Sequence, residues 1–269
     1  MTYGISLHSI VPMRREPAHT SEMTSQLLFG ELYRVLESTE KWLRISMSFD
    51  QYEGWISSAQ ATLIEEDEFI RMSHADTAYT LDLVQLLANE AKKIVLPVVI
   101  GSSLPGLEAQ YFEINGEQYA FEGQVADSDI LESASTPQER MDARNSMLQD
   151  ALVYLNAPYM WGGRSPFGID CSGFVQIVYK MKKISLMRDA SLQATQGEIV
   201  PLLEEAEPCD LAFFDDEEGK ITHVGMLIDR NRIIHASGKV RIDKIDHEGI
   251  YNEGEQRYTH RLRMVRRMV

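Results

Sequence analysis

Two cysteines and seven histidines are the residues of this chain whose side chains best suit nucleophilic chemistry. Cys171 lies in the stretch Asp170-Cys-Ser-Gly-Phe174, which follows a glycine-rich loop and opens an apolar segment with helical spacing. Backbone N–H groups in the first turn of a helix have no intrahelical partner, and they favour a thiolate there. The sequence therefore predicts that Cys171 is a reactive thiol with a lowered pKa.

Two histidines are placed to assist such a thiol. His223 opens one strand-like segment and His235 falls in the next, across a short turn at 229–231. Neighbouring antiparallel strands would bring the two imidazoles side by side, so that one acts as a base and the other fixes its tautomer. From the residues alone a buried structural cysteine with two satisfied strand histidines stays open, as does a zinc site built from the same three residues.

Four ordered blocks of the sequence carry a family resemblance. They are Asp170–Phe174, Pro208–Phe214, His223–Met226 and Ile234–Ala236. Together they resemble the NlpC/P60 peptidases, papain-like cysteine enzymes that cut bacterial cell-wall peptides. The resemblance covers residues 140–269 and implies that Cys171 is the nucleophile, His223 the general base and His235 the orienting residue.

One position departs from the family pattern. The second block of the family has glycine between its proline and its aspartate, and here that position is Cys209. We interpret Cys209 as a small residue tolerated in a turn rather than as a second nucleophile. The contexts of the two cysteines differ, so we expect both to be free thiols.

The N-terminal part has a resemblance of its own. It is carried by Pro12–Arg14, Glu22–Gln26, Gly30-Glu31, Trp42 and Asp50–Ile56. These segments resemble bacterial SH3 modules that are fused to dipeptidyl-peptidase members of the NlpC/P60 family. The resemblance implies substrate contacts, around the free ammonium of an N-terminal L-alanine, from Glu22, Tyr52, Tyr159, Asp170, Ser172 and Asp189. Four of them have a structural alternative: Tyr52 in the module core, Glu22 in a solvated turn, and Ser172 or Asp189 as a helix cap.

The chain divides into three predicted domains. Residues 1–66 contain short strands separated by polar turns and predict an SH3-like module. The acidic run at 65–68 indicates a solvated seam, and residues 67–135 predict a second SH3-like, β-rich module with a helical insertion at 79–93. Residues 136–269 predict the peptidase domain. The expected fold class is α+β, with a papain-like NlpC/P60 catalytic domain preceded by two small SH3-like β-barrel modules.

The sequence also predicts the helices, strands and turns around the reactive residues. Thr136 and Pro137 predict a capped helix start, Cys171–Lys182 a second helix, and Asn115-Gly116 a tight hairpin in the module before it. Strands are predicted at Leu211–Phe214, His223–Asp229, Arg232–Ala236 and Tyr258–Val269. The arginines of the last segment indicate the solvated edge of a final strand.

Charge and composition limit the partners. The formal charge is 26 − 41 = −15, which disfavours a nucleic acid or an anionic membrane surface. No window resembles a membrane-spanning helix, and the N-terminus lacks the pattern of a secretory signal. We expect a cytoplasmic monomer without metal or cofactor, the alternative location being exported or periplasmic after removal of a leader.

These expectations converge on one activity. The resemblance implies a cysteine peptidase that hydrolyses the bond between γ-D-glutamate and a diamino acid, L-lysine or meso-diaminopimelate, in murein peptides with a free N-terminal L-alanine. Two alternatives stay open. One is a catalytically inert protein whose SH3 modules bind wall peptides, and the other is a related acyltransferase.

Overall fold

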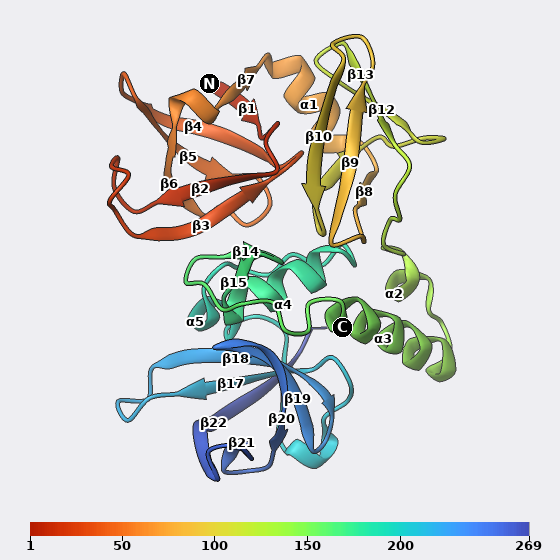
Figure 1. Cartoon of the computed structure of the whole chain (residues 1–269). Helices are drawn as coiled ribbons and strands as arrows, with labels where there is room; N and C mark the ends of the chain where they lie inside the picture. Colours follow the sequence, from red (N-terminus) through yellow and green to blue (C-terminus); the bar gives the residue numbers. More distant parts are fainter. Residues whose placement is uncertain (269) are drawn as a thin grey trace. The chain divides into compact units, whose positions relative to one another are not determined.

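The computed structural model describes residues 1–268 and divides them into two compact units (Figure 1). The first unit consists of Met1–Ser128 together with the short segment Trp161–Pro166. The second contains residues 129–160 and 167–268. In the described part of the chain no helix is long and apolar enough to cross a membrane. The predicted division into three domains stays a prediction.

A seven-stranded antiparallel sheet opens the first unit (Figure 1). Its strands are β1 (Thr2–Ile5), β2 (Ile10–Arg14), β3 (Met23–Leu28), β4 (Leu32–Ser38), β5 (Trp42–Met47), β6 (Glu53–Ser57) and β7 (Thr62–Ile64), with a 3₁₀ turn at Ser58–Gln60. They lie in the order β3-β2-β6-β5-β4-β1-β7. The apolar or aromatic runs at 32–36, 42–47 and 54–56, which predict short strands, lie in β4, β5 and β6.

More strands follow α1 (Glu66–His74). They are β8 (Thr77–Tyr79), β9 (Val84–Asn89), β10 (Ile94–Val99), β11 (Ser103–Pro105), β12 (Tyr111–Ile114) and β13 (Glu117–Phe121). Four of them form a sheet in the order β10-β9-β13-β12, and β11 pairs with β8. Asn115 (φ 55°) and Gly116 (φ 75°) both have positive φ, as a two-residue hairpin of type I′ requires, which confirms the predicted turn.

Two expectations for this region are wrong. The acidic run is no solvated connector, because its carboxylates form the first turn of α1, where the helix dipole stabilises negative charge. The helical insertion is absent from 79–93, where β9 lies instead. Leu86 and Val84 of β9 are exposed although they are apolar, so their helical spacing did not reflect a buried face. Pairing of β9 with β10 and β13 overrides that local pattern.

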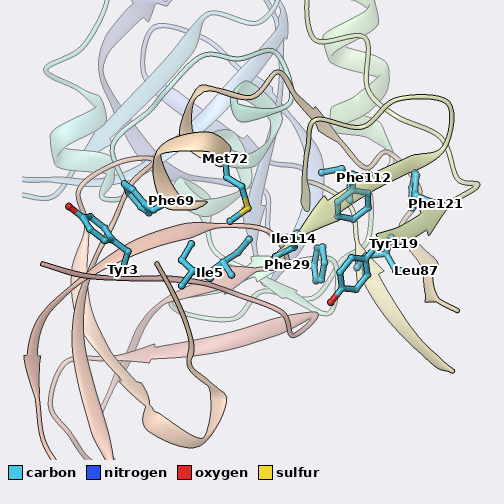
Figure 2. Close-up of a cluster of buried hydrophobic side chains, with 13 residues drawn as sticks. Tyr3, Ile5, Phe29, Phe69, Met72, Leu87, Phe112, Ile114, Tyr119 and Phe121 are labelled. Carbon is cyan, nitrogen blue, oxygen red and sulfur yellow. The ribbon is translucent and has the colours of Figure 1, made fainter. Parts of the chain in front are cut away.

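One hydrophobic core joins both sheets of the first unit (Figure 2). Tyr3 and Ile5 come from β1, Phe69 and Met72 from α1, and the remaining large side chains include those of the second sheet: Leu87, Phe112, Ile114, Tyr119 and Phe121. Phe29 packs edge-on against the ring of Phe112 at 6.3 Å between centroids. The two predicted modules therefore share a core.

The segment Trp161–Pro166 is held in the first unit by a buried ion pair. Arg164 donates to both carboxylate oxygens of Glu31, at 2.8 and 2.9 Å, and to the backbone oxygen of Gln26 at 2.6 Å. Gly162 has φ +75°, and a Cβ there would come within 2.3 Å of the Met23 carbonyl oxygen. Glycine is therefore required at 162 by a close approach of two backbones.

A second seven-stranded sheet dominates the second unit. Its strands are β16 (Glu198–Val200), β17 (Leu211–Asp215), β18 (Ile221–Asp229), β19 (Arg232–Ser237), β20 (Lys239–Ile245), β21 (Gly249–Asn252) and β22 (Arg257–Arg267). Their order is β16-β22-β17-β18-β19-β20-β21, and β21 also pairs with β22, so the sheet closes into a small barrel. Strands β17, β18 and β19 confirm the prediction, whereas β16, β20 and β21 were not predicted.

The final strand differs from its prediction. It spans 257–267 and lies between β16 and β17, so it is no edge strand. Arg261 pairs with Asp215 at 2.7 Å and Arg267 with Asp210 at 2.8 Å, because these partners lie on the neighbouring strand β17 and in the turn before it. Val269, the predicted end of the strand, lies outside the described residues.

Helices α2 (Ile130–Ser133), α3 (Pro137–Leu152), α4 (Cys171–Lys180) and α5 (Ala190–Gln193) complete the second unit, with a 3₁₀ turn at Leu203–Glu205 and the two-residue strand β15 (Gly168–Ile169). A two-residue strand β14 (Arg164–Ser165) lies in the first unit. Thr136 and Glu139 form a reciprocal capping box at the start of α3, which confirms the predicted cap. The described chain is thus of the α+β class, as predicted.

Candidate active site

Cys171 is the first residue of α4, and its position depends on the residue before it. The Asp170 side chain caps the helix by accepting from the backbone N–H of Gly173 at 2.7 Å. Every residue of α4 is buried, so tertiary packing as well as the cap fixes where the helix begins. Cys171 is 6% exposed, and both cysteines of the chain are free thiols, as expected.

The electrostatic surroundings of Cys171 contradict the lowered pKa that we expected. Burial and, to a smaller extent, the neighbouring Asp170 carboxylate raise the pKa of the Cys171 thiol to about 12. Hydrogen bonds from the backbone at Val224 and Ser172, and the charge of Arg188, act in the opposite direction but are weaker. The resting chain therefore holds a protonated thiol at the helix start.

His223 and His235 are adjacent in space, as the two strand segments predicted. His223 lies on β18 immediately before Val224, whose backbone contacts the Cys171 sulfur. Its Nε2 lies 2.8 Å from Nδ1 of His235 on β19. Burial lowers the pKa of His223 well below its ordinary value, and the neighbouring histidines lower it further. The imidazole of His223 is thus neutral at neutral pH.

The row of polar groups continues beyond the two histidines. Nε2 of His235 lies 2.9 Å from Oδ2 of Asp243 on β20, and Nη2 of Arg241 donates to Oδ1 of the same carboxylate at 2.7 Å. Burial opposes ionisation of Asp243, but the hydrogen bonds from His235 and Arg241 outweigh it and hold its pKa below the usual value. Asp243 was not predicted, since β20 itself was not.

His260 is a further histidine at the site, and its spacing from other residues in the sequence did not indicate a role for it. It lies on β22, and its ring stacks on that of His223 with centroids 4.1 Å apart and planes 28° apart. Burial lowers the pKa of His260 to about 4, so it also is neutral at neutral pH. A hollow of about 940 Å³ in the second unit is lined in part by His260 and by Phe214, which packs against both His223 and His260.

Asp170 and Ser172, predicted to contact substrate, form a buried network with Arg188. Arg188 donates to Asp170 at 2.6 and 3.0 Å and to the Ser172 hydroxyl at 2.8 Å. The Ser172 hydroxyl donates to Asp170 Oδ1 at 3.2 Å. All three residues are buried, so their visible role is to fix the start of α4. Arg188 was missed because sequence spacing does not relate it to Asp170.

Tyr159 and Asp189 complete the predicted residues of the second unit. Tyr159 is half-buried, and burial raises its pKa to about 12, with smaller contributions from Cys171 and Asp170, which places its ring near the thiol. Asp189 is exposed and precedes α5 without a side-chain capping bond.

Glu22 and Tyr52 belong to the first unit. The Glu22 carboxylate accepts from the Trp161 indole at 2.7 Å and pairs with Arg15 at 2.9 Å. Tyr52 is half-buried and packs against the core of the first sheet. The substrate contacts inferred for both residues stay predictions.

Cys209 occupies the position where the family pattern has glycine, and the backbone gives a reason for that pattern. Its φ is 73°, in the left-handed region that glycine adopts at little cost. Its side chain is fully buried and its Sγ lies 3.3 Å from the Arg144 carbonyl oxygen. Within residues 1–268, no group of three or more His, Cys, Asp or Glu side chains is arranged to hold a metal ion.

Two known family patterns match parts of this chain. The sequence pattern of the NlpC/P60 family matches residues 156–263, which include Cys171 and the three stacked or hydrogen-bonded histidines. The pattern of the bacterial dipeptidyl-peptidase SH3 domain matches residues 13–60. The first match lies within the predicted catalytic domain, and the second lies within the first predicted SH3 module.

Similar proteins cover most of the chain. A γ-D-glutamyl-L-lysine dipeptidyl-peptidase of Bacillus subtilis is 30% identical over 224 residues, which are 79% of this chain and 71% of that protein. The dipeptidyl-peptidase 6 of Lysinibacillus sphaericus is 25% identical over 87% of this chain and 88% of its own. The crystal structure of an NlpC/P60 family protein from Bacillus cereus has the same fold, with a TM-score of 0.79, 21% identity and coverage of 99% of each chain.

Proposed function

Because the chain belongs to the NlpC/P60 family of cysteine peptidases, we propose that it hydrolyses the bond between γ-D-glutamate and a diamino acid in murein peptides that begin with a free L-alanine. The observation that carries the proposal is a thiol at a helix start whose sulfur contacts the backbone of Val224, next to His223 of the hydrogen-bonded pair His223 and His235. The identity of about 30% to a γ-D-glutamyl-L-lysine dipeptidyl-peptidase supports the substrate class.

The proposed reaction is acyl transfer through a thioester. The Cys171 sulfur attacks the γ-carbonyl carbon of D-glutamate while its proton passes to Nδ1 of His223. The tetrahedral intermediate then expels the amine of the diamino acid, which takes that proton. Water, deprotonated by His223, hydrolyses the thioester and regenerates the thiol.

The neutral resting state sets the order of proton transfer. The pKa of Cys171 is raised and that of His223 is lowered, so the pair rests as thiol and imidazole rather than as an ion pair. Proton transfer accompanies attack instead of preceding it. The backbone N–H of Cys171, which has no intrahelical partner at the helix start, would donate to the oxyanion, and one such donor is worth roughly 3 to 4 kcal/mol.

Hydrolysis of L-Ala-γ-D-Glu-L-Lys by the full chain, followed by chromatographic detection of free lysine, tests the proposal. We expect turnover by the wild type and none above background by Cys171→Ala. His223→Ala should lose several orders of magnitude in kcat. Release of lysine by Cys171→Ala would overturn the assignment of the nucleophile.

Substrate preference is tested by a panel of four peptides. It contains the lysine and diaminopimelate forms, each with a free and with an acetylated L-alanine. We expect the free forms to be cleaved and the acetylated forms to lose most of the rate, because acetylation removes the ammonium charge with which a carboxylate of the enzyme would pair. Equal cleavage of the acetylated forms would remove the ammonium site while leaving the peptidase intact.

A further inference from the structure

Asp243 lies at the end of a continuous row of hydrogen-bonding groups. His235 Nδ1 faces His223 at 2.8 Å, His235 Nε2 faces Asp243 Oδ2 at 2.9 Å, and Arg241 donates to the second oxygen of that carboxylate at 2.7 Å. The side chains of His235 and Asp243 are 1% and 7% exposed. Water therefore has little access to this end of the row.

Strand register brings these groups to one face of the barrel sheet. In the antiparallel pairing of β19 with β20, His235 lies opposite Arg241 and Ile233 lies opposite Asp243. Residues two apart in a strand share a face, so Arg241 and Asp243 both lie on the face that carries His235.

The donors and acceptors of the row can be assigned in sequence from its outer end. An ionised carboxylate only accepts and a guanidinium only donates. Asp243 therefore requires a proton on Nε2 of His235, and a His235 ring that carries a single proton then has a bare Nδ1. That nitrogen requires a proton on Nε2 of His223, which leaves Nδ1 of His223 with a free lone pair.

We propose that Asp243, held by Arg241, is the positioning residue that fixes the tautomers of His235 and His223 and thereby frees Nδ1 of His223 to take the Cys171 proton. This inference rests on the proposed function for its kinetic consequence. Its structural content, the tautomer of each histidine, is independent of any substrate.

The substitution Asp243→Asn keeps the shape of the side chain and changes its hydrogen bonding. Arg241 offers only donors, so the amide oxygen turns to Arg241 and the amide NH₂ faces Nε2 of His235. That nitrogen must then accept, and the proton of His235 moves to Nδ1. His223 Nε2 becomes an acceptor in turn, and its proton occupies Nδ1, where the base is needed.

The kinetic test compares three variants of the full chain on L-Ala-γ-D-Glu-L-Lys. Asp243→Asn should lose about 100-fold or more in kcat with KM changed less than about threefold. Arg241→Met alone should lose less than about fivefold. The double variant should recover at least about tenfold over Asp243→Asn, because its amide is free to turn the oxygen toward His235. Additive losses would indicate a merely structural role and would overturn the proposal.

Imidazole ¹⁵N spectra at pH 8 supply the readout that needs no substrate. We expect protonated Nε2 on His223 and His235 in the wild type, and protonated Nδ1 on both in Asp243→Asn. A wild-type His223 with its proton on Nδ1 would overturn the proposal even if the variant failed to fold. A wild type that shows the expected tautomers but does not cleave the peptide would instead count against the proposed function alone.

Discussion

Among single residues, Cys209 combines a left-handed backbone with a fully buried side chain. Its φ of 73° disfavours any residue with a Cβ, and its Sγ meets the Arg144 carbonyl oxygen. A serine hydroxyl can donate to the same oxygen and has nearly the same size. We therefore expect Cys209→Ser to keep kcat/KM for peptide hydrolysis within about threefold of the wild type.

The matched control for that substitution is Cys171→Ser. It also replaces a side-chain sulfur by oxygen, but at the start of α4, and it should remove turnover. The two thiols are comparably buried, and burial raises the pKa of each to about 12. The Cys171 sulfur contacts the backbone of Val224, next to His223, whereas the Cys209 sulfur contacts the Arg144 carbonyl oxygen. A loss of activity in Cys209→Ser with normal thermal stability would show that the second thiol takes part in the reaction.

At the scale of elements, the start of α4 depends on one carboxylate. Asp170 caps the helix and is the ion-pair partner of Arg188, whose side chain is 1% exposed. Asp170→Ala removes the cap and leaves a buried guanidinium without its carboxylate. We expect it to lower the free energy of unfolding, measured in urea, by about 3 to 5 kcal/mol.

Asp170→Asn separates the two contributions of that carboxylate. The amide oxygen can still accept from Gly173 but carries no charge for Arg188, so the loss should be smaller than in Asp170→Ala. Asp189→Ala is the control, because Asp189 also precedes a helix but is exposed. It should change stability by less than about 1 kcal/mol. Equal losses at 170 and 189 would contradict the role of the buried network.

Some elements could be predicted from the local sequence alone. The cap at Thr136, the Asn115-Gly116 turn and the helix after Asp170 were predictable because a few adjacent residues determine each of them. Strand β9 was not, because its apolar residues match a helix as well as a strand. Its pairing with β13 is set by residues more than 30 positions away.

The same limit explains what was missed in the candidate site. Cys171, His223 and His235 stand in blocks that recur in a family, so their order alone indicated them. His260 and Asp243 reach the site only through the closure of the barrel, which brings β22 and β20 to the histidines. No spacing rule along the chain encodes that closure.

At the scale of the whole molecule, the buried histidines make stability depend on pH. The pKa of His260 is about 4 in the folded chain and that of His223 lies well below its ordinary value, whereas both rise to about 6.5 on unfolding. Below pH 6.5 the unfolded chain therefore binds more protons, and stability falls as the pH falls. Between pH 7 and pH 5 we expect His260 to contribute about 1 to 2 kcal/mol to that loss, measured by urea unfolding at constant ionic strength.

His260→Phe keeps a ring against His223 but cannot be protonated, so it should reduce the loss, while His8→Gln at an exposed position should leave it unchanged. An unaltered pH dependence in His260→Phe would mean that the ring of His260 is not the proton-binding group.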